Sequence, residues 1–417
     1  MSAVSSSATA PDLPPGTPLQ RGNPEVLAGS PVAGPDVLAG EWARATAAVD
    51  AAAEVCLACH VHPDADALGS MLAVAHALLE RQTVGSHPTM SARRPRHGQP
   101  GEQPKPGQRI LTSFGDDPPR VPDNLCFLPG LDLISSPRSY PAEPELMITF
   151  DAASSGRLGM LASNASRANE LIVIDHHPSN TRFGTIHLVD PAAAATAVLA
   201  CDLIDRLGLP LTRPVALGLY AGLVTDTGSF KHASTTVAVH QLAARLLATG
   251  IEPEAVAREL WDRAPFGYLP VLARALGRAV LEPRHAGGRG LVWTAVSRAD
   301  RQAHGLGYDQ VEPVIDVVRR TADAEIAVVF KEDDGGRWHV SARSKGNVDV
   351  GRVCVELGGG GHRVAAGFTS RWPVEHAIQR LRELLADIGS GPADDGKPRP
   401  DGQSAADGKP TVADGGR

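Results

Sequence analysis

Histidine and aspartate residues stand directly after three short apolar runs of the chain. The side chains concerned are, in chain order, His60 with Asp64 and Asp66 just beyond it, then Asp151, then Asp175, His176 and His177. The apolar runs cover residues 55–59, 146–150 and 171–174, and such β-branched or apolar runs indicate buried strands of a parallel sheet. Ligands of open α/β sheets bind beyond the carboxyl ends of these strands. We therefore expect the seven side chains to meet at one edge of one sheet.

Four carboxylates and three imidazoles, with no cysteine among them, are typical ligands of a divalent metal of the Mn²⁺ or Mg²⁺ type. The imidazole content favours Mn²⁺, with Mg²⁺ as the alternative ion. A single Asp or His at a strand end usually caps a helix, but capping explains three such clusters poorly. Two ions about 3.5–4 Å apart, sharing one carboxylate, would use most of these ligands and suit phosphoester hydrolysis. Asp151 is the predicted bridge because it comes alone from its own strand.

The two adjacent histidines are expected to have different roles. Neighbouring imidazoles diverge in direction, so His176 and His177 should not bind one ion equally. We predict that His176 is a metal ligand and that His177 donates to the phosphate or to the leaving group. Asp175 is then expected to orient an imidazole rather than to bind metal directly.

A glycine run, Gly358 to Gly361, precedes His362 near the end of the ordered sequence. Glycines allow backbone amides to approach a ligand without interference from a Cβ atom, which suits an anion. Glycine-rich segments are more often simple turns, and Arg343 on its own would be an ordinary surface cation. The arginine at the end of the preceding predicted strand nevertheless supplies a fork that matches a phosphate. The predicted substrate contacts are Arg343, Gly359, Gly360, Gly361 and His362.

The chain of 417 residues is long enough for two domains and two tails. Alternating strand and helix patterns predict a parallel-sheet α/β catalytic domain followed by a smaller α+β substrate-binding domain. The expected divisions are a disordered tail at 1–38, the catalytic domain at 39–250, a helical linker at 251–284, the second domain at 285–388 and a disordered tail at 389–417. Residues 83–108, rich in proline and glycine, are predicted to be an inserted loop, with a functional lid as the alternative.

Local signals place the helices of the catalytic domain. Apolar residues at helical spacing predict a helix over 67–81. Asp190-Pro191 predicts the start of a second helix that runs to Leu207, with Asp as N-cap and Pro in the first turn. A third helix is expected to begin at Thr212 and to end near Asp226.

Composition excludes several classes of protein. The net charge of −7 offers no basic stripe of the kind that follows a long nucleic-acid backbone. No window approaches twenty uninterrupted apolar residues, and no secretory signal is visible, so a cytoplasmic location without a membrane span is expected.

Cys56 and Cys59 are spaced three apart within a predicted strand, which places them on opposite faces and argues against a shared metal.

The motifs in combination resemble the DHH phosphoesterase superfamily, in its NrnA-like branch of oligoribonucleases and pAp phosphatases related to RecJ. The resemblance covers residues 41–388. Its motifs are the segments 60–70, 150–151, 175–177 and 222–228, with 358–362 and 365–367 matching the substrate-binding domain. It implies that one ion is held by His60, Asp64 and Asp151. It implies that the other is held by Asp66, Asp151, His176 and Asp226, and that the substrate phosphate lies against His362 and Arg343.

The resemblance implies a Mn²⁺-dependent phosphohydrolase that releases 5′-mononucleotides from very short RNAs and dephosphorylates 3′-phosphoadenosine 5′-phosphate. Cyclic dinucleotides or their linear products are the alternative substrates. A pyrophosphatase is disfavoured by the glycine run and its histidine. A non-catalytic nucleotide-binding module is the hypothesis from another class, and its signature would be a missing ligand. No predicted ligand is missing. Assembly as a homodimer is left open.

Overall fold

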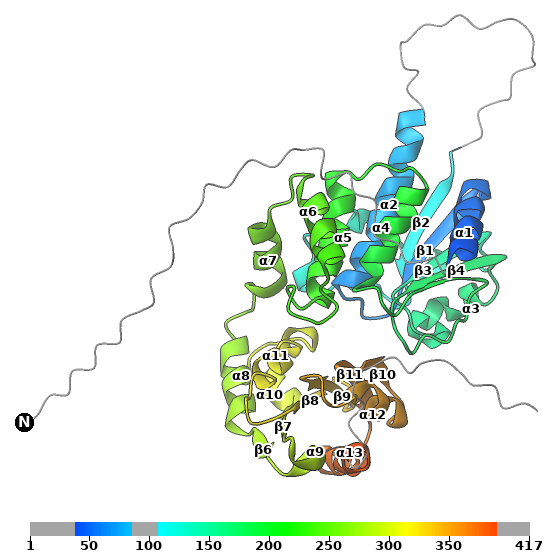
Figure 1. The fold of residues 1–417 in the computed structure, drawn as a ribbon. Coiled ribbons are helices and arrows are strands. Elements are labelled where there is room, and N and C mark those ends of the chain that lie inside the picture. The colour runs from blue at the N-terminus through cyan, green and yellow to red at the C-terminus, as the bar shows by residue number, and fades with distance from the viewer. Residues whose placement is uncertain (1–37, 86–106, 390–417) are drawn as a thin grey trace, which may run out of the picture.

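The computed structural model describes residues 38–85 and 107–389, which form two sheet-containing regions in chain order (Figure 1). The predicted tails and most of the predicted insertion at 83–108 lie outside the described residues. The expected architecture is confirmed, because a parallel-sheet region comes first and a smaller mixed-sheet region follows. No helix of the described residues is long and apolar enough to cross a membrane.

The first region is built on a five-stranded parallel sheet in the order β2-β1-β3-β4-β5. Its strands are β1 (Glu54–Cys59), β2 (Arg109–Phe114), β3 (Leu146–Phe150), β4 (Glu170–Asp175) and β5 (Ile186–Val189). The central strands β1, β3 and β4 are buried on both faces, which explains their nearly continuous apolar sequences. Parallel pairing brings the carboxyl ends of these three strands to the same edge.

Helices and short helical turns cover both faces of this sheet. The larger core lies under α1 (Ala39–Ala51), α2 (Ala65–Gly85), α4 (Thr196–Arg206), α5 (Arg213–Asp226) and α6 (Val237–Leu247). The opposite face packs against the 3₁₀ segment η5 (Ser155–Leu161) and α3 (Ala162–Ala165). Cys59 belongs to the first core and Cys56 to the second, in agreement with the alternation of a strand.

Helix α4 begins later than the sequence predicts, at Thr196 rather than after Asp190. Asp190 instead closes a turn, in which its side chain accepts a hydrogen bond from the backbone N–H of Ala192. The first N–H groups of α4 are taken by a distant carboxylate: those of Thr196 and Ala197 donate to Asp66, at 2.6 and 2.8 Å. The N-terminus of the helix is thus capped from α2, a tertiary contact that no local signal encodes.

Two helices connect the regions: α7 (Pro253–Trp261) and α8 (Tyr268–Gly277). The second sheet has the order β10-β11-β9-β8-β7-β6 and is antiparallel except for the parallel pair of β7 and β8. Its strands are β6 (Val280–Glu282), β7 (Leu291–Val296), β8 (Ile326–Glu332), β9 (Trp338–Ser344), β10 (Gly360–His362) and β11 (Ala365–Ser370). Edge strand β6 lies within the range predicted as a helical linker.

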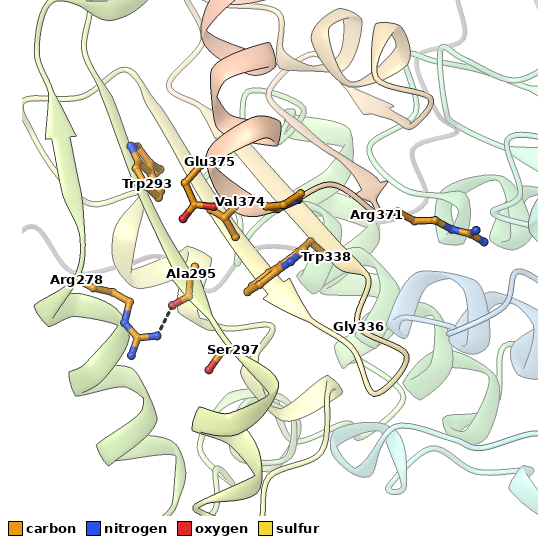
Figure 2. Close-up of a pocket in the computed structure, with 10 residues that line it drawn as sticks. Arg278, Trp293, Ala295, Ser297, Gly336, Trp338, Arg371, Val374 and Glu375 are labelled. Carbon is orange, nitrogen blue, oxygen red and sulfur yellow. Dashed lines mark hydrogen bonds between the residues drawn. The ribbon is translucent and has the colours of Figure 1, made fainter.

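The helices of the second region are α9 (His285–Gly288), α10 (Arg298–Gln302), α11 (Val314–Val318), α12 (Val350–Glu356) and α13 (Val374–Gly389). Helices α12 and α13 pack on one face of the sheet, while α8 and α11 pack on the other. The face under α13 carries a pocket of about 590 Å³ whose walls include Trp293 and Trp338 (Figure 2). Because side chains alternate along β9, Trp338 and Arg343 lie on opposite faces. This pocket is therefore separate from the predicted substrate contacts.

Candidate metal centre

Six predicted metal ligands meet at the carboxyl edge of the first sheet. Each comes from a strand end or from a helix that begins or ends there: His60 follows β1, Asp64 and Asp66 open α2, Asp151 follows β3, His176 follows β4 and Asp226 ends α5. The side chain of Asp64 caps α2 by accepting from the backbone N–H groups of Asp66 and Ala67. Strand register and helix capping together thus bring the side chains to one place.

Asp151 lies at the centre of this cluster and is almost completely buried, with 3 % of its surface exposed. Its backbone has a φ of 58°, in the left-handed region that Asp tolerates better than most residues. Oδ2 lies 3.5 Å from His60 Nε2, while Oδ1 lies 3.5 Å from His176 Nε2. The two carboxylate oxygens therefore face two different sets of ligands, as a bridging carboxylate must.

The two predicted ligand sets are visible as two groups of converging atoms. His60, Asp64 and Asp151 form one group, and Asp66, Asp151 and His176 form the other; within each, the ligand atoms lie within 4.8 Å of one another. The carboxylate of Asp226 adjoins the second group, with Oδ2 3.1 Å from His176 Nε2. The set that the resemblance implied is thus assembled without exception.

The surroundings of His176 test whether these groups fit a metal ion. Its Nε2 atom is buried and makes no hydrogen bond, although carboxylate oxygens surround it. Its Nδ1 faces the carbonyl oxygen of Ala193 at 3.2 Å, which holds the proton of the neutral ring on that nitrogen, so the Nε2 of the neutral ring is an acceptor that can bind a cation or, in the absence of one, a second proton. An acceptor nitrogen among carboxylate oxygens fits a cation. The donors present therefore fit a pair of divalent ions.

Without a bound cation, this edge of the sheet carries an excess of buried carboxylates. Burial, together with the Asp226 and Asp151 carboxylates, raises the pKa of Asp66 well above its usual range. Burial alone would lower the pKa of His176, but the neighbouring carboxylates of Asp226 and Asp151 raise it to about 11. In the same way Asp151 and Asp64 raise the pKa of His60 to about 10 against the effect of burial. These carboxylates attract protons where a metal ion would supply the positive charge.

A close approach of two helices is needed to bring Asp226 to the site. A Cβ atom at Gly222 of α5 would lie 2.6 Å from the Asp66 carboxylate, and one at Gly69 of α2 would lie 2.3 Å from the carbonyl oxygen of Gly218. Only glycine permits this contact between α2 and α5. The packing places the last residue of α5 beside His176, which sequence spacing alone does not indicate.

His177 and Asp175 contact each other beside the cluster of predicted ligands. The Asp175 carboxylate is fully buried, and its Oδ1 lies 2.7 Å from His177 Nδ1. Its other oxygen accepts a hydrogen bond from the side-chain amide of Asn180 at 2.6 Å. Asp175 therefore fixes the orientation of the His177 ring. The sequence analysis did not single out Asn180. Its closeness to Asp175, five residues earlier in the chain, could have suggested a contact.

The second region reaches the same place through His362, at the end of β10. Its ring lies 4.5 Å from that of His177 with an interplanar angle of 22°, and 4.6 Å from that of His176. Burial and the two neighbouring imidazoles lower the pKa of His362 to about 3, so it is neutral in this arrangement. The nitrogen lone pairs lie in the ring planes, so the stacked rings of His177 and His362 are poorly aimed at one shared ion. Ring nitrogens of His176, His177 and His362 nevertheless lie within 4.8 Å of one another, so the substrate role of His362 stays a prediction.

The last two glycines of the run, together with His362, form the edge strand β10, and Gly358 and Gly359 precede it. Gly360 to His362 pair antiparallel with Ala365 to Gly367, which leaves the outer side of β10 without a strand partner. A Cβ atom at Gly359 would lie 2.0 Å from the carbonyl oxygen of Gly367, and Gly361 has a φ of 134°. Both positions therefore require glycine for the backbone itself.

Arg343 lies half-buried on the sheet face opposite α13. Its guanidinium donates to the carbonyl oxygen of Ala342, and among the described residues it has no carboxylate within ion-pair distance. Lys331 on β8 shares this face and is nearly inaccessible, but it pairs with Glu312 and donates to Ser341. Among the described residues, the Arg343 guanidinium therefore donates only to one backbone carbonyl, which leaves other N–H groups for an anionic ligand.

Thr196 is a further side chain that the sequence did not single out. Its hydroxyl donates to Asp151 Oδ1 at 2.8 Å from the first turn of α4. Arg157 is another: its Nη2 lies 3.1 Å from His60 Nδ1. Neither residue belongs to the strand-end motifs, and only the tertiary fold places them at the site.

Comparisons with known proteins agree with this arrangement. Residues 54–223 match the DHH family, N-terminal domain, and residues 295–389 match the DHHA1 domain. The chain is 31 % identical, over 79 % of its length and 88 % of the relative, to the bifunctional oligoribonuclease and PAP phosphatase NrnA of Thermus thermophilus. It is 30 % identical to the cyclic-di-AMP phosphodiesterase GdpP of Geobacillus thermodenitrificans, over 56 % of this chain but only 34 % of that relative.

A solved structure supports the fold. The exopolyphosphatase-related protein from Bacteroides fragilis aligns with a TM-score of 0.69 and 20 % identity, covering 84 % of this chain and 96 % of the other. The order of the two matched domains is the order of the two sheets described above. The chain therefore belongs to the DHH phosphoesterase superfamily, in its NrnA-like branch, with a DHH domain followed by a DHHA1 domain.

Proposed function

We propose that this chain is a two-metal phosphohydrolase that degrades very short oligoribonucleotides to 5′-mononucleotides and dephosphorylates 3′-phosphoadenosine 5′-phosphate. The observation that carries the proposal is the buried Asp151, whose two oxygens face two separate sets of metal ligands. The name of the Thermus relative, which spans nearly the same length, supports both activities. The roles below are part of this proposal.

His60, Asp64 and Asp151 would hold one ion, and Asp66, Asp151, His176 and Asp226 the other. We propose Mn²⁺ in both positions because imidazole is among the ligands of each, with Mg²⁺ as the alternative. When bound, such a pair lowers the pKa of water and neutralises charge on a phosphoryl group. Asp151 requires Thr196 to hold its orientation through the hydroxyl contact to Oδ1.

His177 would act on the substrate itself. Asp175 holds the proton on Nδ1, so Nε2 is left to exchange a proton or to accept a hydrogen bond. The neighbouring carboxylates of Asp175 and Asp151 raise the pKa of His177 although burial opposes them. A protonated imidazole would stabilise the phosphoryl charge or protonate the leaving oxygen.

Arg343, His362 and the backbone of Gly359 to Gly361 would hold another part of the substrate. His362 contacts His177, so the substrate-binding sheet edge and the metal centre are neighbours. This proximity favours a short substrate, since its reacting phosphate and its anchored end must fit between them. We propose short RNA and nucleotides as partners; the cytoplasmic location and a homodimer stay predictions.

The test is an assay of purified protein with Mn²⁺ on dinucleotides, five-nucleotide RNA, twenty-nucleotide RNA and 3′-phosphoadenosine 5′-phosphate. We expect kcat/KM to fall steadily as the RNA lengthens, with 3′-phosphoadenosine 5′-phosphate also hydrolysed. Equal kcat/KM on the dinucleotide and the twenty-nucleotide RNA would contradict the short-substrate proposal and favour a processive exonuclease.

Cyclic dinucleotides are the second candidate substrates, because the chain is similar to part of a cyclic-di-AMP phosphodiesterase. The same assay includes cyclic-di-AMP and its linear dinucleotide. Faster hydrolysis of the cyclic compound than of the linear one would favour this alternative. Faster hydrolysis of the linear compound would count against a cyclic substrate, and the leading proposal then requires that short RNA and 3′-phosphoadenosine 5′-phosphate are hydrolysed as well.

A further inference from the structure

Arg157 is fixed at the rim of the metal centre by its own backbone. Its carbonyl oxygen accepts a hydrogen bond at 2.9 Å from the backbone N–H of Val61, which directly follows the ligand His60. Two residues later Gly159 has a φ of 55°, and a Cβ atom there would lie 2.4 Å from the Val61 side chain. The segment after β3 therefore turns back across the end of β1 in a conformation that only glycine permits.

The guanidinium of Arg157 contacts His60 without a satisfactory hydrogen bond. His60 Nε2 faces the carboxylates of Asp64 and Asp151, so it is the nitrogen on the side of an ion. Its Nδ1 lies 2.8 Å from the carbonyl oxygen of Val61, which can only accept, so Nδ1 carries the proton. Arg157 Nη2, 3.1 Å from Nδ1, then meets another donor.

Within the described residues, the Arg157 side chain has no hydrogen-bond acceptor that would compensate for this contact. The Arg157 side chain is exposed, and none of the described residues places a carboxylate within ion-pair distance of it. A guanidinium offers five N–H donors in a planar fork that matches two oxygens of a phosphate. The Arg157 guanidinium lies beside the ligand set of His60, in a centre built around carboxylates. The partner that would satisfy its N–H donors is an anion.

We propose that Arg157 binds non-bridging oxygens of the phosphoryl group that is hydrolysed, on the His60 side of the centre. This inference rests on the proposed function, which supplies the phosphate ester. Arg157 is then a catalytic residue that neutralises charge on the reacting group, while Arg343 anchors a remote part of the substrate. The two arginines are distinguishable, since the first should affect kcat and the second KM.

The experiment compares Arg157→Gln and Arg157→Lys with the unchanged protein. Metal binding is measured first, by titration with Mn²⁺, and both variants should bind two ions with near-normal affinity. For Arg157→Gln we expect kcat on a dinucleotide to fall by about 10²-fold or more with KM changed much less. Arg157→Lys should lie between, because it keeps the charge and loses the fork.

Inorganic phosphate provides a readout that does not depend on turnover. We expect the Mn²⁺-loaded Arg157→Gln protein to bind phosphate about tenfold more weakly than the unchanged protein. Guanidinium ion added to an Arg157→Ala variant should restore part of the lost turnover. The matched control is Arg167→Gln, since Arg167 is also exposed and bonds only to a backbone carbonyl, that of Ala142.

Two results would overturn the inference. Unchanged phosphate affinity together with a kcat within about threefold of normal would remove Arg157 from the reacting group. Loss of Mn²⁺ in proportion to activity would mean that Arg157 acts through His60. If the unchanged protein hydrolyses neither RNA nor 3′-phosphoadenosine 5′-phosphate, the proposed function fails, while the phosphate titration still decides the role of Arg157.

Discussion

The two sides of the centre are constructed in different ways. On the DHH side four of the six predicted ligands, His60, Asp66, Asp151 and His176, are buried, whereas Asp226 is half-buried and Asp64 is exposed. The carboxylates are also tied to neighbours: Asp66 accepts from two backbone N–H groups of α4, and Asp151 from Thr196. On the DHHA1 side, His362 and Arg343 are only half-buried, and Arg343 bonds to one adjacent carbonyl. The difference teaches that the fold restrains the predicted metal ligands more tightly than the predicted substrate contacts.

The contact between the sides is an aromatic stack rather than a polar network. His362 and His177 lie with ring centroids 4.5 Å apart, a distance that leaves no room for a phosphate between them. Near it, a Cβ atom at Gly360 would be 3.9 Å from Ser179 Oγ, so β10 approaches the loop after His177. A phosphate could therefore lie between these two rings only if the rings separated.

The largest expected effect comes from the residue shared by both ligand sets. Asp151→Asn should reduce activity by at least about 10³-fold and weaken both ions, because each set loses its common oxygen donor. Calorimetric titration with Mn²⁺ measures the number of ions and their affinities. The control is Asp50→Asn, a substitution in an exposed surface ion pair with Arg81. Two ions bound with normal affinity by Asp151→Asn would show that Asp151 is not the bridge.

The next effect separates the two histidines. His177→Ala should lower kcat by about 10²-fold while leaving the Mn²⁺ content nearly intact, since His177 acts on substrate rather than on metal. Asp175→Asn should reproduce part of this loss by releasing the ring. His187→Ala is the control, because His187 contacts only the backbone of Arg182 through its ring. Loss of metal along with activity would make His177 a ligand and refute the division of roles.

The DHHA1 side should respond through substrate affinity. Arg343→Ala should raise KM for the dinucleotide by about 10- to 10²-fold and lower kcat less, the cost of losing a charged hydrogen-bond donor. Arg337→Ala is a suitable control on the same hairpin, since Arg337 pairs with Asp333. Steady-state kinetics on both variants decides the matter. A fall in kcat without a change in KM would place Arg343 at the reacting phosphate instead of at the anchored end.

Sequence predicted the DHH side better than the DHHA1 side, for a physical reason. The ligands at strand ends follow from parallel register, because three buried runs must end at one edge. The late start of α4 did not follow, since it depends on Asp66 reaching across from α2. The glycine run was recognised for its freedom but not as an edge strand, because strand pairing with β11 is a non-local choice. Asp226 was supplied by the family resemblance alone.

The smallest expected effect is a dependence of the Mn²⁺ affinity on pH, which tests the excess of carboxylates on the DHH side. In the metal-free protein, carboxylates around His60 and His176 raise their pKa values to about 10 and about 11, although burial opposes the change. Both rings are therefore protonated at neutral pH before metal binds, and each must lose its proton from Nε2 to become a ligand. Protons and ions compete, so the affinity for Mn²⁺ should rise with pH.

The sign and size of this effect are open to direct measurement. For each proton displaced, the affinity for Mn²⁺ should increase about tenfold per pH unit while the pH stays below the pKa values. Calorimetric titrations at pH 6, 7 and 8, in buffers of different ionisation enthalpy, count the protons released. The His187→Ala control should follow the same line. An affinity that does not change over this range, or an uptake of protons on binding, would contradict the proposed ligand roles of His60 and His176.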